Sequence, residues 1–278
     1  MMSSTPGTGD DSPPATDAPA GPVISAKDLR VQYGDREILH GISFDVNAME
    51  TIVILGGSGS GKSTLLRTLV GLEKPTSGAV WVGGTNLAQA SQSELDSARK
   101  KIGLSFQGGA LIGSMTVGEN VALPLLEHTD LNPSTIEVMV RIKLQQVGLI
   151  KFQHFMPSQL SGGMKKRAAL ARATAMDPEI LFFDEPSAGL DPITAAGIDA
   201  LILNLKRALA VTIVVVTHEM ASAFLIADRI IVLDGGHIAA IGSIAELKQS
   251  THPRIQQFLN RVPDSDAEDD ADHLKLFD

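Results

Sequence analysis

Apolar positions at the start of the chain fall into short runs typical of strands. The β-rich stretches at residues 23–33, 42–46 and 79–82 are separated by Gly and Asp, which predicts an antiparallel sheet. Residues 51–55 are continuously apolar or β-branched, as expected of a buried strand, and lead through a Gly-rich loop into a helical stretch at residues 62–70. The pattern therefore predicts an antiparallel β region followed by a strand, a loop and a helix.

The middle of the chain carries helix signals instead. Two Ser or Thr residues stand three positions before a Glu, which is the spacing of a capping box. An Asn-Pro pair at residues 132–133 opens a periodic run that stops at Gly148. We expect an inserted α-helical subdomain at about residues 107–175. The capping-box pairs are Ser91 with Glu94 and Thr116 with Glu119.

Alternation of strands and helices resumes after this insertion. Apolar runs at residues 180–183 and 212–216 flank a helix that an Asp-Pro pair opens at residues 191–192. Residues 229–233 and 237–241 are joined across two glycines, as in a β-hairpin. No internal repeat is visible. The predicted fold class is α/β, with a mixed β core, an antiparallel β subdomain and the inserted helical subdomain.

Composition separates two tails from the body of the chain. Residues 1–22 consist largely of Pro, Gly, Ser, Thr, Asp and Ala, which predicts a disordered tail. Residues 263–278 hold seven acids and one Lys, an acidic tail that we also expect to be disordered. The tails carry the whole net charge of −9, so residues 23–262 are neutral. A protein that binds duplex nucleic acid would be expected to show a basic excess, and we therefore predict no nucleic-acid partner.

Residue types and run lengths exclude further classes. The chain has no cysteine, which rules out disulfides, a Cys-based zinc site and a thiol nucleophile. Its longest apolar runs are four or five residues, whereas a membrane-spanning helix needs about 20. The N-terminus lacks the basic start and apolar block of a secretory signal. We expect a cytosolic protein that contacts a membrane only through partners.

The Gly-rich loop after residues 51–55 fits a phosphate-binding pattern. Its sequence GGSGSGKST matches G-x-x-x-x-G-K-[ST] and lies between a strand and a helix. Glycines let backbone N–H groups surround a polyanion, Lys62 reaches the β- and γ-phosphates, and Ser63 offers a hydroxyl to Mg²⁺. The helix N-terminus adds partial positive charge. The predicted ATP-binding residues are Gly56, Ser58, Gly59, Gly61, Lys62, Ser63 and Thr64.

Two carboxylates follow the apolar run at residues 180–183. Adjacent acids at a strand end are as often a solvated turn as a site, but the phosphate loop upstream favours a site. We expect Asp184 to orient Mg²⁺ through water. Glu185 is then the predicted general base that polarises the attacking water.

Residues 160–164, LSGGM, resemble the signature motif of ATP-binding-cassette (ABC) ATPases, and the resemblance extends over residues 23–250. It implies a P-loop NTPase of the ABC type, working as a homodimer in which the signature motif of one protomer grips the γ-phosphate held by the other. Met164 departs from the family pattern, which has Gln there. The roles implied are adenine stacking for Tyr33, catalysis and Mg²⁺ contact for Gln107, γ-phosphate contact for Ser161, Gly162 and Gly163, a D-loop position for Asp191, and catalytic γ-phosphate contact for His218.

Each of these positions also has a structural alternative. Tyr33 could cap a strand, Gln107 could be a plain loop residue, and His218 could be a hydrogen-bonded histidine at a strand end. The Ser-Gly-Gly sequence at residues 161–163 could be a flexible turn. We expect the basic residues 165–167 to form a solvated helix face, and a contact with nucleotide or with a partner is the alternative.

Residues 106–111, 124–129, 160–173 and 252–259 are similar to the ATPase subunit of bacterial MCE-type phospholipid transporters, the maintenance-of-lipid-asymmetry (Mla) group. The resemblance implies phospholipid transport, with permease, MCE-domain and STAS-domain partners, at the cytoplasmic face of the bacterial inner membrane. Transport of another solute remains the alternative. A nucleic-acid clamp would need a long insertion or a second cassette, and a non-hydrolysing sensor would not need both Glu185 and His218.

A short helix is predicted at residues 251–262. Its apolar residues 255, 258, 259 and 262 have i, i+3, i+4, i+7 spacing. The stripe packs either on its own domain or on a dimer mate or accessory subunit. A truncation of residues 251–278 with unchanged assembly and ATPase rate would exclude the second alternative.

Overall fold

The computed structural model describes residues 21–260 and 262. The two predicted tails, residues 1–22 and 263–278, lie outside this range except for residues 21 and 22. The division of the chain into a domain at residues 23–250 with an inserted helical subdomain stays a prediction.

A mixed sheet of order β10-β9-β3-β8-β7-β6 forms the centre of the described fold. The pairs β3–β8, β3–β9, β7–β8 and β6–β7 are parallel, whereas β9 and β10 pair antiparallel. Every residue of β3 and β8 is buried, as expected of parallel strands covered on both faces. The strands are β3 (Thr51–Gly56), β6 (Ile102–Ser105), β7 (Ile180–Asp184), β8 (Thr212–Thr217), β9 (Arg229–Asp234) and β10 (His237–Gly242).

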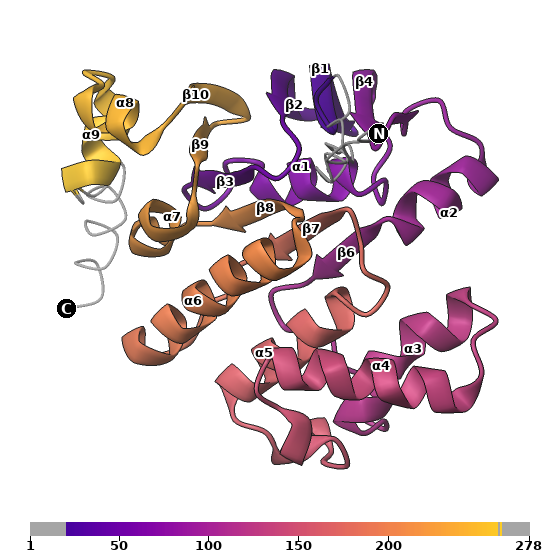
Figure 1. Cartoon of the computed structure of the whole chain (residues 1–278). Coiled ribbons are helices and arrows are strands. Elements are labelled where there is room, and N and C mark those ends of the chain that lie inside the picture. The colour runs from indigo at the N-terminus through magenta and orange to yellow at the C-terminus, as the bar shows by residue number, and fades with distance from the viewer. Residues whose placement is uncertain (1–20, 261, 263–278) are drawn as a thin grey trace, which may run out of the picture.

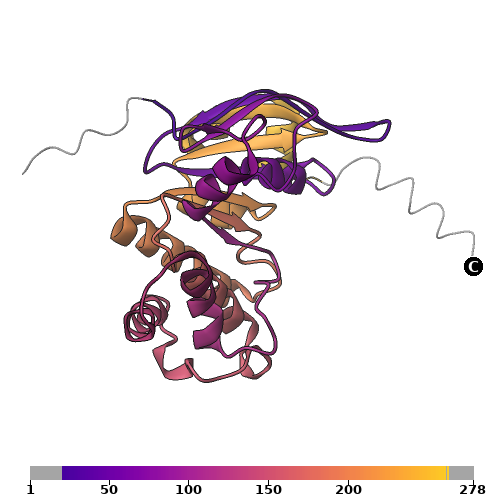
Figure 2. The same cartoon turned by 90° about the vertical axis from the view of Figure 1, so that its right-hand side faces the viewer.

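A second, antiparallel sheet covers one side of this core and has the order β2-β1-β4-β5. Figure 2 shows it as the upper layer of the molecule. The prediction of an antiparallel β region is thereby confirmed. The strands are β1 (Ile24–Tyr33), β2 (Arg36–Val46), β4 (Ser77–Val82) and β5 (Thr85–Asn86).

Three helices, α3, α4 and α5, pack on one another in a layer apart from the antiparallel sheet (Figure 1). Both predicted capping boxes form, at the starts of α2 and α3. The helices are α1 (Lys62–Leu69), α2 (Gln92–Lys100), α3 (Val117–His128), α4 (Pro133–Gln146), α5 (Gly162–Ala173), α6 (Pro192–Leu209), α7 (Met220–Ile226), α8 (Ile244–Gln249) and α9 (Pro253–Asn260), with 3-10 turns at Ile150–Phe152 and Pro157–Gln159.

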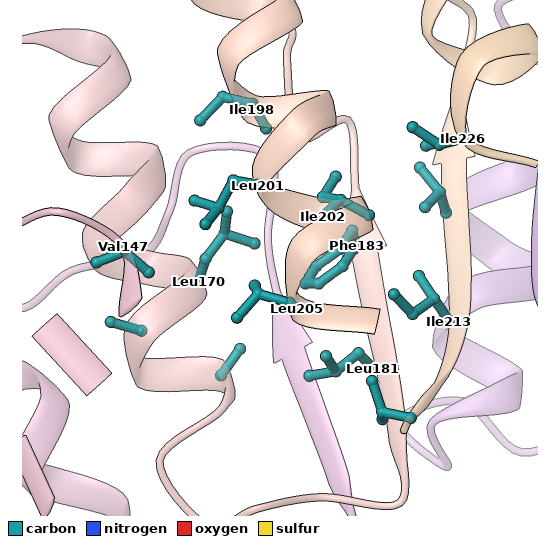
Figure 3. Close-up of a cluster of buried hydrophobic side chains, with 14 of the residues drawn as sticks. Val147, Leu170, Leu181, Phe183, Ile198, Leu201, Ile202, Leu205, Ile213 and Ile226 are labelled. Atoms are coloured by element: carbon teal, nitrogen blue, oxygen red, sulfur yellow. The ribbon is translucent and has the colours of Figure 1, made fainter. Parts of the chain in front are cut away.

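The helical layer and the central sheet share one apolar core. Leu170 of α5, Leu205 of α6 and Phe183 of β7 belong to the same cluster of buried side chains (Figure 3). Burial of side chains of this size typically contributes about 1.5–3 kcal/mol each. Packing therefore fixes α5 relative to the central strands. Within the described range, none of the helices has the length and apolar character to cross a bilayer.

Strand β6 and the C-terminal helix differ from the sequence-based expectations. Strand β6 was not predicted, because Gly103 and Ser105 interrupt its apolar run. The C-terminal helix ends at Asn260, so Val262 lies beyond it and is exposed. Ile255 is buried, which confirms packing of α9 on its own domain, and docking on a dimer mate or accessory subunit stays a prediction. Phe258 and Leu259 pack against the same core.

Candidate nucleotide-binding and hydrolytic site

The predicted site residues gather at one edge of the central sheet. Parallel strands β3, β6, β7 and β8 end at this edge, and a different sequence motif follows each of them. Leu55 is paired with Thr217, and Asp184 with Val216. The phosphate loop, the Gln107 loop, the carboxylate pair and His218 are thus neighbours because of strand order alone.

Backbone geometry makes glycine necessary within the phosphate loop. A Cβ on Gly56 would collide with the carbonyl oxygen of Leu233, and Gly61 has φ +100° at the start of α1. Gly61 provides no side-chain cap, which leaves the first N–H groups of α1 available to a ligand. The Lys62 ammonium donates to the carbonyl oxygens of Gly56 and Gly57 at 2.9 and 2.7 Å. Burial lowers the pKa of Lys62, against the opposing effect of Glu185 and Asp184.

The remaining loop residues face outward. Ser58, Gly59 and Ser63 are exposed, and Thr64 is half-buried. Tyr33 is also exposed and lies close to Thr64 and Glu73. Partial burial, followed by the neighbouring Glu73 carboxylate, raises the pKa of the Tyr33 phenol. The tyrosine ring therefore stands beside the first turn of α1, where an adenine attached to bound phosphates could reach it.

Oxygen-bearing side chains from helix α1 and strand β7 line a small cavity next to the loop. The cavity, of about 60 Å³, is lined by Ser63 and Asp184 together with Arg67 and several apolar residues. Burial, and secondarily the charge of Glu185, raises the pKa of Asp184. Arg67, Lys166 and Lys62 act in the opposite direction. The described residues contain no cluster of three or more His, Cys, Asp or Glu suited to a metal ion. The lining of this cavity therefore offers two oxygen ligands, and any further ligands must come from outside the lining.

Glu185 is held from several sides. Its backbone has φ +48°, an uncommon conformation for a residue with a side chain. Its amide donates to Val216 at 2.8 Å. The carboxylate accepts a hydrogen bond from the Thr217 hydroxyl at 3.1 Å and lies 2.8 Å from Nδ1 of His218. The buried carboxylate of Glu185 is thus fixed between two residues at the end of β8, while the His218 side chain is largely exposed.

Lys166 corrects the expectation of a solvated face at residues 165–167. Its side chain is buried, and its ammonium donates to the carbonyl oxygens of Glu185, at 2.8 Å, and of Gln107. Gln107 itself is exposed in the loop after β6. Arg167 is half-buried and donates to the Val147 carbonyl oxygen.

The signature residues form a separate surface at the start of α5. The Ser161 hydroxyl accepts a hydrogen bond from the Met164 amide at 3.3 Å and so caps the helix. A Cβ on Gly163 would lie 2.5 Å from the Thr194 methyl group, and one on Gly162 would lie 3.3 Å from Leu190. The signature therefore packs closely against the start of α6.

Asp191 is the N-cap of α6. Its carboxylate accepts hydrogen bonds from the backbone amides of Ile193 and Thr194 and from the Thr194 hydroxyl. The Thr194 hydroxyl, followed by the Thr194 amide, lowers the pKa of Asp191. The structure thus gives Asp191 a capping role, and its predicted contact with nucleotide stays a prediction.

Sequence reasoning missed three residues that contact the predicted machinery. Thr217 and Lys166 hold Glu185, and the Arg254 guanidinium lies 3.4 Å from the position of a Cβ on Gly57. Thr217 could have been found, because it ends an apolar strand directly before His218. The other two depend on contacts between segments distant in the sequence, and no local pattern indicates them.

The sequence is similar to known proteins over most of its length. The ABC transporter family matches residues 39–188. MlaF of Escherichia coli (strain K12), described as an intermembrane phospholipid transport system ATP-binding protein, is 42% identical over 242 residues, which are 87% of this chain and 90% of MlaF. Mkl of Mycobacterium leprae, described as a probable ribonucleotide transport ATP-binding protein, is 40% identical over 87% of this chain and 70% of mkl.

Solved structures resemble the fold as well. A dimeric post-hydrolysis state of the ATP-binding cassette MJ0796, bound to ADP and Pi, has a TM-score of 0.73 and 32% identity, over 80% of this chain and 98% of that one. CbiO1 from Clostridium perfringens, part of the ABC transporter complex cbiONQ, has a TM-score of 0.77 and 28% identity, over 86% and 95%.

Proposed function

This chain belongs to the ABC transporter family as the ATP-hydrolysing subunit of a transporter, and from this premise we propose that it drives phospholipid transport as a homodimer whose protomers share the ATP sites. The observation that carries the assignment of ATP hydrolysis to this chain is the position of Glu185. Its carboxylate is held by Thr217 and His218 at the edge of the sheet where β3 ends and the phosphate loop follows.

The residues at this edge support a division of labour in hydrolysis. The loop N–H groups and Lys62 bind the phosphates, and the Lys62 ammonium exchanges its two loop carbonyl partners for phosphate oxygens. Glu185 accepts a proton from the attacking water. His218 lies against the same carboxylate and contacts the γ-phosphate, and Gln107 contacts that phosphate from the loop after β6. Tyr33 stacks on the adenine.

The cavity beside the loop suits Mg²⁺. The Ser63 hydroxyl and Asp184 carboxylate are hard oxygen ligands, and Mg²⁺ sites beside phosphates commonly use one or two protein ligands, with phosphate and water completing the shell. The ion supplies charge neutralisation of the β- and γ-phosphate oxygens when bound. Gln107, from the neighbouring loop, is the further proposed ligand.

The homodimer rests on the signature surface. The start of α5 carries an exposed serine hydroxyl next to a helix N-terminus, which suits an anion. In the proposed dimer, Ser161, Gly162 and Gly163 of one protomer contact the γ-phosphate on the loop of the other, near Asp191. Two solved structures of the similar cassette MJ0796 are described as dimeric.

Phospholipid is proposed as the substrate because of the similarity to MlaF and because of the resemblance at residues 106–111, 124–129, 160–173 and 252–259. The proposed partners are a permease and MCE-domain and STAS-domain subunits at the cytoplasmic face of an inner membrane. A solute of another class is the second candidate, and the similarity to mkl, described as a probable ribonucleotide transport protein, favours a ribonucleotide.

Reconstitution separates these candidates. The chain and its membrane subunits are placed in proteoliposomes with a fluorescent phospholipid, and ATP-dependent transfer to an acceptor is measured, with a Glu185→Gln complex as the blank. Parallel vesicles test uptake of a labelled ribonucleotide. We expect lipid transfer only. Ribonucleotide uptake without lipid transfer would contradict the phospholipid proposal and leave the ATPase assignment intact.

A further inference from the structure

Lys166 is a buried lysine that joins three distant parts of the chain. Lysine is almost never fully buried unless it is paired, yet the Lys166 residue is only 8% exposed. Lys166 lies in the second turn of α5, and its ammonium donates to the backbone carbonyl oxygens of Gln107 and Glu185. The helical layer, the loop after β6 and the end of β7 thereby meet at one nitrogen atom.

The Glu185 contact acts on a strained piece of backbone. Glu185 has φ +48°, and conformations of this kind persist only where surrounding contacts hold them. The amide of Glu185 is held by Val216 at 2.8 Å, and its carbonyl oxygen is held by Lys166 at 2.8 Å. Both peptide groups that flank the Glu185 side chain are therefore fixed. On the C-terminal side the carbonyl oxygen accepts from the Ala188 amide at 3.2 Å as well, and Lys166 supplies the shorter and charged contact.

Charge gives the same contact a second effect. Glu185 and Asp184 are adjacent carboxylates, and the Glu185 charge contributes to the raised pKa of Asp184. Lys166 is one of the cations that oppose this shift. Burial lowers the pKa of Lys166 while both carboxylates favour its charged form. A neutral side chain of similar length would keep the packing and lose both the hydrogen bonds and the compensating charge.

We propose that Lys166 is a positioning residue for ATP hydrolysis, which holds the Glu185 carboxylate in line for proton transfer and ties its position to the Gln107 loop. The proposal rests on the general-base role proposed for Glu185. Lys166 acts through backbone carbonyl oxygens and does not contact the nucleotide. Loss of its ammonium should therefore change kcat and leave the affinity for ATP nearly unchanged.

The test compares Lys166→Met with Lys143→Met in the purified full-length chain. Lys143 is a matched control, because it is also buried and ion-paired, with Asp177, but lies on α4. We expect Lys166→Met to lower kcat between about 10- and 100-fold, the usual scale for a misplaced catalytic group, with KM for ATP within about 3-fold. Lys166→Arg, which keeps charge and donors, should recover part of the lost rate. Lys143→Met should keep kcat within about 2-fold, even if its melting temperature falls.

A double mutant tests whether the effect passes through Glu185. In a Glu185→Gln background, adding Lys166→Met should slow single-turnover hydrolysis by less than about 2-fold, because residues that act as a unit are not additive. An equal loss in both backgrounds, or a kcat within about 2-fold of wild type for Lys166→Met alone, overturns the proposal. If the Met variant does not fold, Lys166→Gln is judged by the same criteria. Full activity of Glu185→Gln itself would instead refute the general-base role.

Discussion

The two Gly-rich helix starts of this chain, at α1 and α5, satisfy their N-terminal N–H groups differently. The N-cap residue of α1 is Gly61, which has a left-handed conformation and provides no side-chain cap. The N-cap residue of α5 is Ser161, which is extended and whose hydroxyl accepts a hydrogen bond from the Met164 amide at 3.3 Å. The backbone N–H groups at the start of α1 are therefore available to a ligand. At the start of α5, one of these N–H groups already donates to the Ser161 hydroxyl.

The surroundings of the two helix starts also differ. The phosphate loop is tied to the rest of the fold, because the Ser60 carbonyl oxygen accepts from the Gly236 amide at 3.1 Å and a Cβ on Gly61 would lie 2.8 Å from the Leu39 side chain. Ser161 and Gly162 are exposed. A pre-formed loop that is held by neighbouring strands suits a ligand bound by a single chain, and an exposed cap at a separate surface suits a ligand that another chain presents. The comparison supports the assignment of primary binding to the loop and of dimer contact to the signature.

The largest expected effect is on the loop side of this comparison, at Glu185. Glu185→Gln keeps the shape of the side chain and removes the proton acceptor, so kcat should fall by about 10² to 10⁴ while ATP binding is retained. Steady-state ATPase assays and calorimetry measure the two quantities. Glu179→Gln, just before the opposite end of β7, is the control and should be near wild type. Hydrolysis by Glu185→Gln at a near wild-type rate would refute the general-base role.

Lys62→Ala removes the cation of the loop itself. A hydrogen bond to a charged group typically contributes 1.5–3 kcal/mol, so the affinity for ATP should fall by about 100-fold and binding heat should vanish at micromolar concentrations. Isothermal calorimetry on the isolated chain measures this. Lys151→Ala, at an exposed lysine of the helical layer, should bind ATP normally. Unchanged affinity in Lys62→Ala would mean that the loop is not the primary phosphate site.

Ser161→Ala tests the other helix start, at α5. It should leave ATP affinity of the single chain within about 2-fold and lower kcat about 10-fold, because one charge-assisted contact to the γ-phosphate is lost. Loss of the cap should also cost about 1 kcal/mol of stability. Ser91→Ala removes an equivalent cap, on α2, and should show the stability loss without the rate loss. Equal kcat values for Ser161→Ala and Ser91→Ala would contradict a contact between the Ser161 hydroxyl and the γ-phosphate.

Much of this architecture follows from local sequence patterns. The buried strands β3, β7 and β8 are continuous apolar runs, and the phosphate loop is defined by residue types that its backbone requires, as the collisions at Gly56 show. Strand order then brings the predicted residues to one edge. The position of Glu185 at the end of a buried strand was predicted for the same reason.

The features that escaped prediction depend on tertiary contacts. A run of three basic residues on a helix does not show which one turns inward, and Lys166 does so only because two backbone carbonyl oxygens lie beside α5. The left-handed backbone of Glu185 and the approach of Arg254 to Gly57 likewise depend on neighbours distant in the sequence. The capping role of Asp191 is an intermediate case, since the Asp-Pro pair did predict the start of α6.

The central claim is that one ATP is held by the loop of one copy and the signature of another, and the mass of the Glu185→Gln protein under saturating MgATP tests it most directly. Analytical ultracentrifugation should give the 29.3 kDa single chain without nucleotide. With ATP it should give a species of about twice that mass, and Ser161→Ala in the same background should reduce its amount. A single-chain mass at saturating ATP, with full hydrolysis by the wild-type monomer, would contradict the account.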